Sequence, residues 1–422
     1  MKYARITFAI LAALRVSASA YGQQAHPPVV NARPAWAQLA KLTSSQLYPY
    51  GVGYSVAISG NVIVVGAPYG QFVSLYVMPP SGWGSMVETA ILTASDEPLC
   101  GSFGWSVAIV GKTVVVGDPS TYCPPQTGAA YVYVEPAAGW SGTLTENAKL
   151  TASDAVSGDS VGNSVAVAGT SIVAGAPYQA SGLGAAYVFT EPPGGWVNAT
   201  QTAKLTPSDG LAMEDFGLSV SASGNVIVAG APNRMIGANQ YQGTAYVYVE
   251  PSGGWSNATQ TAELNSSPQQ PGYMAASVSV SGPVIVAGDS YQCAAYVFVE
   301  PSSGWVNMTQ TAMLTESAGN TGDELGASVA VDGNFIAVGA PRYNGKPNTP
   351  FWEEGAAFIF AKPAGGWMNA TETSRVTGSD ARFEAFLGTS VAVSRGTVVP
   401  AALFSGRRNL GAAYVFDRFT GQ

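Results

Sequence analysis

The chain is poor in the residue types on which most catalytic and metal sites depend. Its 422 residues include one histidine, His26, and three cysteines, and only 10% of them are charged. A single histidine excludes centres that need two imidazoles, and no His, Cys and acidic residues have the spacing of a metal site. We therefore expect a non-enzymatic protein. Hydrolases or lyases that use only paired carboxylates stay open, because the sequence does not show which acids lie together.

Long apolar segments are also absent after residue 20. Residues 1–20 contain Lys2 and Arg5, a short apolar core and the small residues Ala18-Ser19-Ala20. This pattern predicts a secretory signal peptide cleaved after Ala20, because the core is too short to span a bilayer. Its loss would change the net charge from −8 to about −11. An acidic surface disfavours nucleic acid and anionic membranes, so we expect a secreted protein without membrane insertion.

Glycine is abundant, with 50 residues, and a sixteen-residue segment occurs seven times. The first copy, GYSVAISGNVIVVGAP, is Gly53–Pro68. Two β-branched runs around a Ser-Gly-Asn turn predict a β-hairpin, and the unbroken second run predicts a strand covered on both faces. The period of about 56 residues is typical of propeller blades. The valine after the common serine recurs at Val56, Val107, Val165, Val220, Val278, Val329 and Val391.

Each repeat contains two further predicted strands. An AAYVF-type segment follows the hairpin, and a Pro-Gly-Trp turn leads from it to an AKLT-type segment. A tryptophan at a fixed place in each unit is expected to pack between neighbouring units. These tryptophans are Trp83, Trp140, Trp196, Trp255, Trp305 and Trp367.

The two ends of the chain complement each other. The seventh repeat stops after its third strand, Ala412–Asp417, whereas a lone fourth-strand segment, Trp36–Thr43, precedes the first repeat. Pairing these segments would close a ring without an open sheet edge. We predict an all-β fold, a seven-bladed β-propeller of four-stranded antiparallel blades over residues 36–418. Residues 21–35 are a flexible lead-in, and residues 419–422 are a tail.

Literal Phe-Gly pairs at Phe103-Gly104 and Phe216-Gly217, and Gly-Ala-Pro triplets such as Gly66-Ala67-Pro68, lie in phase with the repeat. In these motifs residues 36–418 resemble the FG-GAP repeat family, the blades of the integrin α-subunit propeller, and most closely secreted bacterial FG-GAP proteins. The resemblance implies extracellular recognition and adhesion. It also implies calcium sites in DxDxDG-like loops between the first two strands. Here those turns are SGN, VGK, AGT, SGN, SGP, DGN and SRG, too short and too poor in carboxylates for calcium, so we expect no cofactor.

Strand direction assigns the loops to two faces. The hairpin turns and Gly-Trp turns share one face and are uniform, whereas the loops entering the first strand and leaving the second share the other and vary. Specificity on a repeated scaffold usually resides in variable loops. Residues at these strand ends suit a glycan or peptide chain, although they could merely cap the strands. The candidate ligand-binding residues are Tyr54, Tyr69, Trp105, Asn163, Tyr178, Asn233, Tyr291, Arg342 and Phe404.

Acidic residues recur in the loops before the first strand. We expect them to be solvated, with a bound cation as the alternative. They are Asp159, Glu214, Asp215, Asp323, Glu324 and Glu384. Three other acids end T-x-S-D segments and are expected to bond within their own turns: Asp154, Asp209 and Asp380.

The cysteines suggest one crosslink. Cys100 and Cys123 flank the first two strands of the second unit, so a disulfide is expected in a secreted protein, whereas Cys293 is predicted to be a buried free thiol. Four Asn-x-Thr segments follow the tryptophans at one fixed place, which favours a structural turn over glycosylation. Their asparagines are Asn198, Asn257, Asn307 and Asn369.

Three functions fit these observations. We favour a monomeric, non-enzymatic recognition or adhesion module that binds an extracellular protein or glycan through the variable loops. The alternatives are a carbohydrate-active enzyme that uses loop carboxylates such as Asp323 and Glu324, and a structural component of an envelope or matrix.

Overall fold

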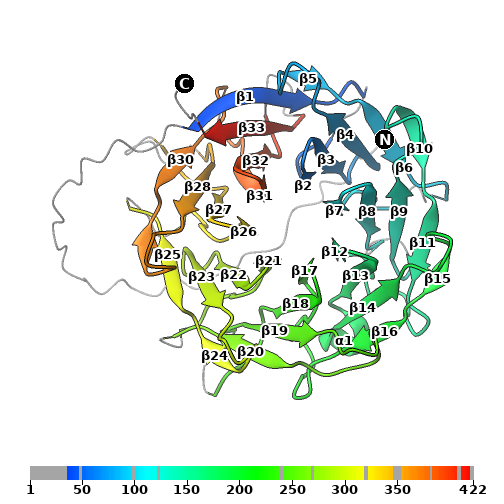
Figure 1. Ribbon diagram of the computed structural model, residues 1–422, viewed down its shortest axis with the longest axis vertical. Coiled ribbons are helices and arrows are strands. Elements are labelled where there is room, and N and C mark those ends of the chain that lie inside the picture. The colour runs from blue at the N-terminus through cyan, green and yellow to red at the C-terminus, as the bar shows by residue number, and fades with distance from the viewer. Residues whose placement is uncertain are drawn as a thin grey trace, which may run out of the picture. The chain divides into compact units, whose positions relative to one another are not determined.

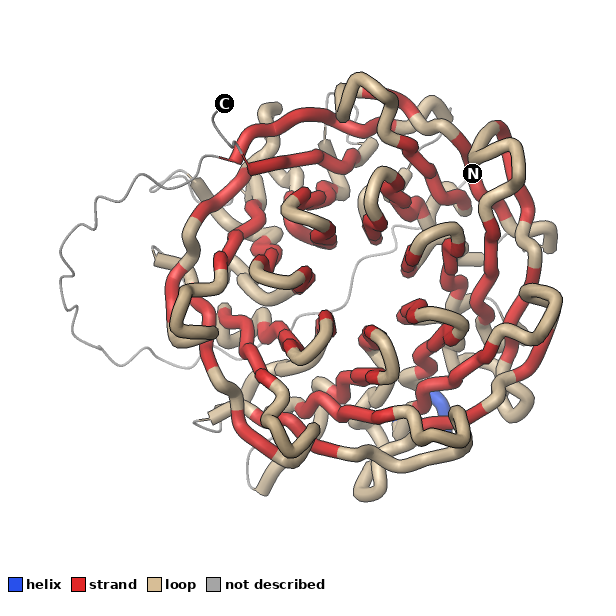
Figure 2. The backbone as a smooth tube through the Cα atoms, in the orientation of Figure 1, coloured by secondary structure: helices blue, strands red, loops and turns tan. Residues whose placement is uncertain are grey.

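The computed structural model describes residues 36–46, 50–96, 101–120, 124–237, 241–267, 270–317, 322–345, 353–380, 383–405 and 410–418. Within these ranges the chain forms seven antiparallel blades arranged in a ring (Figures 1 and 2). The predicted signal peptide, lead-in and tail lie outside the described residues, as do Cys100 and Cys123.

Each blade is built from four strands that run outward from the centre of the ring. The innermost strands are β2 (Ser55–Ser59), β7 (Ser106–Val110), β12 (Ser164–Ala168), β17 (Ser219–Ser223), β21 (Ser277–Ser281), β26 (Ser328–Asp332) and β31 (Leu387–Ser394). The second strands are β3 (Val62–Ala67), β8 (Thr113–Asp118), β13 (Ser171–Ala176), β18 (Val226–Ala231), β22 (Val284–Asp289), β27 (Phe335–Ala340) and β32 (Thr397–Ala402).

The outer half of each blade follows in chain order. The third strands are β4 (Phe72–Val77), β9 (Ala129–Val134), β14 (Ala185–Thr190), β19 (Thr244–Val249), β23 (Ala294–Val299), β28 (Ala356–Ala361) and β33 (Ala412–Arg418). The fourth strands are β6 (Ala90–Thr93), β11 (Ala148–Thr151), β16 (Ala203–Leu205), β20 (Ala262–Asn265), β25 (Ala312–Thr315), β30 (Ser374–Val376) and β1 (Trp36–Thr43). The one helical element of the described residues, α1 (Gln179–Gly182), is a short turn in a loop.

Five blades carry a fifth, short strand that the four-strand prediction missed. This strand comes from the following blade and pairs parallel with the fourth strand. The short strands are β5 (Met86–Val87), β10 (Gly142–Thr145), β15 (Ala199–Thr200), β24 (Met308–Thr309) and β29 (Ala370–Thr371). They tie these five blades to the next blade at the rim of the ring.

The ring closes as predicted, through the first strand of the chain. β1 pairs antiparallel with β33, with Ala40 opposite Val415 and Leu42 opposite Ala413. The side chain of Leu42 is fully buried. The innermost strands of the first and last blades, β2 and β31, also pack together. The seventh blade is therefore shared between the two ends of the described chain, and no blade is left with an open seam.

The core lies between blades. The second strands are buried on both faces, as their unbroken Val and Ile runs predicted. Each hydrophobic cluster combines strands of two neighbouring blades with one tryptophan, such as Trp196 with Val132 and Val165. The prediction that the tryptophans pack between units is confirmed.

The glycine of the Gly-Ala-Pro triplet marks the closest approach of two blades. A Cβ atom added to Gly175 would lie 2.0 Å from the carbonyl oxygen of Gly217 in the next blade. The same contact recurs between Gly117 and Gly162, and between Gly339 and Gly388. Since a Cβ cannot approach an oxygen so closely, only glycine fits these interfaces.

Candidate functional site

The loops that enter the innermost strands and leave the second strands form one surface, here called the variable-loop face. Among the described residues, eighteen large hydrophobic side chains are exposed, and twelve of them belong to these loops. Exposed apolar side chains that gather on one face are typical of interaction surfaces. The twelve are Tyr50, Tyr69, Val156, Tyr178, Leu211, Met213, Met235, Tyr241, Tyr273, Tyr291, Phe383 and Phe404.

Three of the predicted binding residues form an aromatic cluster at the junction of the first two blades. The ring centroids of Tyr54 and Trp105 lie 4.5 Å apart, and those of Tyr54 and Tyr69 lie 6.1 Å apart. Tyr69 is 55% exposed, and the other two are partly buried. Tyr54 and Trp105 precede adjacent innermost strands, so candidate residues of two blades meet here.

The other predicted residues lie on the same face but are not brought together. The amide of Asn163 donates to the carbonyl oxygen of Leu218 at 3.0 Å, and Asn233 donates to the Asp215 carboxylate at 2.7 Å. Tyr178 lies at the start of α1 and is 42% exposed. Arg342, Phe404 and Tyr291 each belong to a different local group.

Arg342 belongs to a charged group in the sixth blade. Its guanidinium lies 2.8 Å from the carboxylate of Glu324 and 3.1 Å from that of Glu353. The pKa of the Glu324 carboxyl is raised by burial and by the charge of Glu353, against the opposing effect of Arg342. In the seventh blade, Phe404 packs edge-on against Phe386 at a centroid distance of 5.9 Å.

Tyr291 is the most exposed member of a second aromatic cluster, between the fourth and fifth blades. Tyr273 stacks on Tyr241 at 5.9 Å and meets Tyr291 edge-on at 6.1 Å. The sequence prediction missed Tyr241 and Tyr273. The sequence did contain a signal for this cluster: Asp289 stands where most blades have the alanine of the Gly-Ala-Pro motif. In the structure its carboxylate accepts from the backbone N–H groups of Tyr273 and Tyr291.

The prediction that the loop acids are solvated is wrong for most of them. Asp159, Glu214 and Asp323 are at most 4% exposed. The Asp159 carboxylate accepts from the backbone N–H of Val156 at 2.8 Å, and Glu214 pairs with Arg234 at 2.7 Å. These acids buttress the loops. Only Glu384 is exposed as expected.

Two acids have raised pKa values. Burial raises the pKa of Asp215 to about 6. Burial, together with the charges of Asp323 and Glu372, raises the pKa of Glu316 to about 7. Both groups lie in loops of the variable-loop face, but no three acids, histidines or cysteines among the described residues are arranged to hold a metal ion.

The aspartates of the T-x-S-D segments bond across blades, which their predicted role in their own turns did not include. Asp154 accepts from the Tyr187 hydroxyl at 2.8 Å and from the Lys204 ammonium at 2.6 Å, both in the next blade. Burial opposes ionisation, but these two donors bring the pKa of Asp154 below its ordinary value. Asp380 makes the same pair of contacts with Tyr414 and Lys41 at the ring closure.

The Asn-x-Thr asparagines have the structural role that their position predicted. The side-chain oxygen of Asn198 accepts from the backbone N–H of Lys149 at 2.7 Å, and that of Asn257 accepts from Lys204 at 2.8 Å. Asn307 and Asn369 make the equivalent bonds. Each asparagine thus fixes the short parallel pairing at the blade rim.

A second side-chain contact recurs at all seven blade interfaces: a Gln or Glu oxygen accepts from the backbone N–H of a serine in the preceding blade. Gln201 accepts from the backbone N–H of Ser153 at 2.9 Å and donates to its hydroxyl at 2.9 Å. At the ring closure Gln38 makes the same pair of bonds with Ser379, at 2.9 and 3.0 Å.

The predicted free thiol of Cys293 is confirmed, although it is only partly buried. The predicted pairing of Cys100 with Cys123 lies outside the described residues and stays a prediction.

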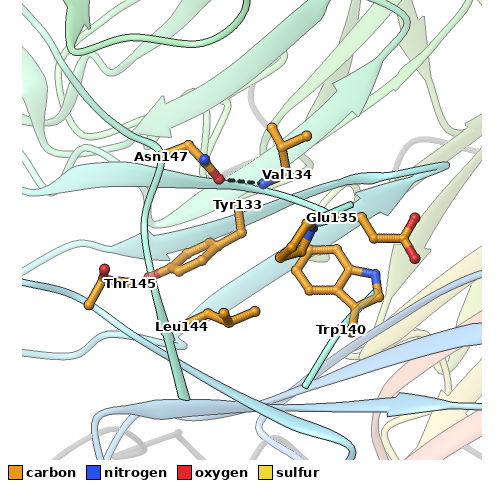
Figure 3. A pocket seen from close by; sticks show the side chains of 8 residues that line it. Tyr133, Val134, Glu135, Trp140, Leu144, Thr145 and Asn147 are labelled. Carbon is orange, nitrogen blue, oxygen red and sulfur yellow. Dashed lines mark hydrogen bonds between the residues drawn. The ribbon is translucent and has the colours of Figure 1, made fainter. Parts of the chain in front are cut away.

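A pocket of about 280 Å³ lies on the opposite face, at the tryptophan turn of the second blade (Figure 3). Its wall includes Tyr133, Trp140 and Leu144, and Asn147 accepts from the backbone N–H of Val134 at 2.6 Å. Thr202 makes the corresponding bond in the third blade. The pocket is below the usual size for ligand sites and belongs to a turn that other blades share, so we regard it as structural.

A serine in the third blade matches the Gly-x-Ser-x-Gly pattern of hydrolase nucleophiles. Ser160, within Gly158–Gly162, is fully buried, and its hydroxyl donates to the carbonyl oxygen of Gly158 at 3.3 Å. The chain then continues into strand β12 and not into the helix that a nucleophile elbow requires.

No helix among the described residues has the length and apolar character needed to cross a membrane.

Four segments of the chain match the model of the FG-GAP repeat: residues 86–133, 144–189, 199–248 and 308–360. Each match includes the outer strand or rim of one blade and ends in the third strand of a following blade, in phase with the structural repeat. No curated protein matches the chain.

Proposed function

Since the chain belongs to the FG-GAP repeat family, we propose that it is a secreted, non-enzymatic recognition module whose variable-loop face binds an extracellular protein or glycan. The propeller supports a recognition scaffold, because its blades are held by repeated contacts while its loops differ. The proposal goes further in naming a face, a class of partner and a location outside the cell.

One observation carries the choice of face. Two thirds of the exposed large hydrophobic side chains among the described residues belong to the variable loops. The aromatic cluster of Tyr54, Tyr69 and Trp105 concentrates amphipathic rings there, of the kind enriched at binding hot spots. The turns of the opposite face are short and nearly identical from blade to blade, which gives them little capacity for specificity.

The test is a binding screen with the mature chain against glycan arrays and extracellular protein fractions. Tyr69→Ala and Trp105→Ala are expected to weaken binding at least tenfold, as loss of an aromatic anchor usually does. Val197→Ala is the control, because Val197 is 56% exposed beside a tryptophan turn of the opposite face. Binding that survives both aromatic changes, or that is lost in the control, would contradict the assignment of the face.

Two further measurements separate the remaining functions. Sequencing of the secreted protein should find Tyr21 as its first residue. Polysaccharide turnover that is abolished by Asp323→Asn or Glu324→Gln would instead indicate an enzyme. A blank binding screen would leave the structural envelope or matrix role.

A further inference from the structure

The second aromatic cluster has the properties of a built site. Tyr241, Tyr273 and Tyr291, here called the tyrosine platform, are 48%, 40% and 64% exposed. They come from three loops: the loop after β18, the loop that leads from the fourth blade to the fifth, and the loop after β22. Their centroid separations of 5.9 and 6.1 Å make one continuous aromatic surface across the blade junction.

A buried carboxylate holds the platform in place. Asp289 is 1% exposed and accepts from the backbone N–H groups of Tyr273 at 3.1 Å, Tyr291 at 3.2 Å and Gln292 at 3.0 Å. The same acid thus anchors two of the three tyrosines.

The third tyrosine is fixed by the backbone. The carbonyl oxygen of Tyr241 accepts from the N–H of Gly272 at 2.9 Å, and Gln292 donates to the carbonyl oxygen of Pro271. Tyr241 has a φ of 57°, which is unfavourable for a tyrosine and persists only where the surroundings impose it. The rings are therefore presented without the ordering cost that a flexible loop would incur on binding.

The platform differs from the rest of the face in carrying no charge. The described loop residues around the rings, 241–243, 266–267, 270–276 and 290–293, contain no Asp, Glu, Lys, Arg or His. Arg234, earlier in the loop after β18, is paired with Asp209 and Glu214. The polar side chains around the rings are serines, tyrosine hydroxyls and the amides of Gln. In the sixth blade, by contrast, Arg342 and its acidic partners occupy the corresponding surface.

This chemistry selects a class of ligand. Exposed aromatic rings bury flat apolar surface, while uncharged amides and hydroxyls exchange hydrogen bonds with hydroxyl groups. A neutral sugar offers both, in the apolar face of a pyranose ring and in its hydroxyls. An anionic ligand would find no cation here and would meet a protein with a net charge of −8.

We infer that the tyrosine platform is a binding site for a neutral glycan, whose pyranose rings stack on the exposed tyrosines at the junction of the fourth and fifth blades. This inference rests on the proposed function, since it names the ligand class for one part of the variable-loop face.

The experiment is titration of the mature full chain with neutral oligosaccharides. The probes are tetra- to hexasaccharides of β-linked glucose, N-acetylglucosamine, galactose and mannose, followed by calorimetry and by tyrosine fluorescence. Tyr273→Ala and Tyr291→Ala are expected to weaken binding of the best probe roughly tenfold or more. Tyr273→Phe keeps the ring and should retain most of the affinity. Val306→Ala removes a comparably exposed side chain beside a tryptophan turn of the opposite face and should change nothing.

The outcomes separate the platform from the wider proposal. Neutral glycan binding that is lost in Trp105→Ala but kept in Tyr273→Ala and Tyr291→Ala overturns the platform and leaves the proposed function standing. Binding of sulfated or sialylated glycans alone also overturns it, as does a protein partner with no glycan binding. If wild type binds neither glycans nor proteins, both inferences fail. Circular dichroism of each variant confirms folding, and the high exposure of Tyr291 makes its truncation harmless to the core.

Discussion

Asp289 should be a stronger determinant of local structure than any other acid in the variable loops. Replacing it with alanine removes the acceptor for three backbone N–H groups, from residues 273, 291 and 292. An unsatisfied buried donor costs about 1–3 kcal/mol. Burial raises the pKa of the Asp289 carboxyl in spite of its three donors. Part of the stabilisation from these three hydrogen bonds therefore only offsets the cost of burying the charge. We expect Asp289→Ala to lower the free energy of unfolding by about 3 kcal/mol.

The assay is urea unfolding followed by circular dichroism, combined with amide hydrogen exchange. Exchange should accelerate at Tyr273, Tyr291 and Gln292 before it does so elsewhere, because their acceptor has been removed. Asp289→Asn keeps one side-chain oxygen as acceptor and removes the buried charge, so its loss should be smaller than that of alanine.

Asp118 supplies a matched control in the second blade. It occupies the same position in the repeat and accepts from the N–H groups of Ser102 at 2.8 Å and Ser120 at 2.9 Å. Asp118→Ala should therefore destabilise the protein by about 2 kcal/mol and leave exchange at the tyrosine platform unchanged. If Asp289→Ala costs less than about 1 kcal/mol and leaves the exchange of Tyr273 and Tyr291 unaltered, the anchoring argument is refuted.

Three further predictions follow from the contacts between blades and from the loop acids. Gly175→Ala should lower the free energy of unfolding by about 1–3 kcal/mol, because the added Cβ would lie 2.0 Å from the backbone of the next blade. Gly253→Ala is the control, since Gly253 has open space around it, and it should change the free energy of unfolding by less than about 0.5 kcal/mol. Urea unfolding measures both. Asp215 has a folded pKa raised to about 6, so its contribution to stability is present below pH 4 and is lost as the pH rises through 6. Asp215→Asn should stabilise the protein by about 1 kcal/mol above that pH, after allowance for its solvent exposure, and not at all below pH 4; an equal effect at both pH values would argue against burial of the charge. Deletion of residues 36–43 should leave β33 unpaired and produce association on size-exclusion chromatography, with the added peptide restoring the monomer; a truncated chain as stable and monomeric as the parent would disprove closure by β1.

The architecture could be predicted from sequence because each blade repeats a local pattern. The hairpin of Gly53–Pro68 is encoded by its β-branched runs and its turn, and seven phased copies require a ring or a stack. Closure was also predictable, since a lone AKLT-type strand at one end complements a missing one at the other. Even the tryptophan positions follow, because a large side chain at a fixed place in every unit must pack against the next unit.

The acids and aromatic residues of the loops could not be placed in this way. The motifs around Asp154 and Asp289 do not show that the first bonds across a blade interface and that the second buttresses two loops. Tyr241 and Tyr273 lie 32 residues apart, in loops of unlike length, and their stacking depends on where those loops fold over the fourth and fifth blades.

The sequence alone thus determined the all-β repeat, the number of blades, the closing strand and the face on which the loops vary. These properties depend on the repeat of about 56 residues and on the β-branched runs and turns within each copy, all of which can be read from residues close together in the chain. Only the tertiary structure decided which loop side chains meet, which acids are buried and which tyrosines form one surface. Those contacts join loops of different blades, and their geometry depends on backbone paths that no local pattern encodes.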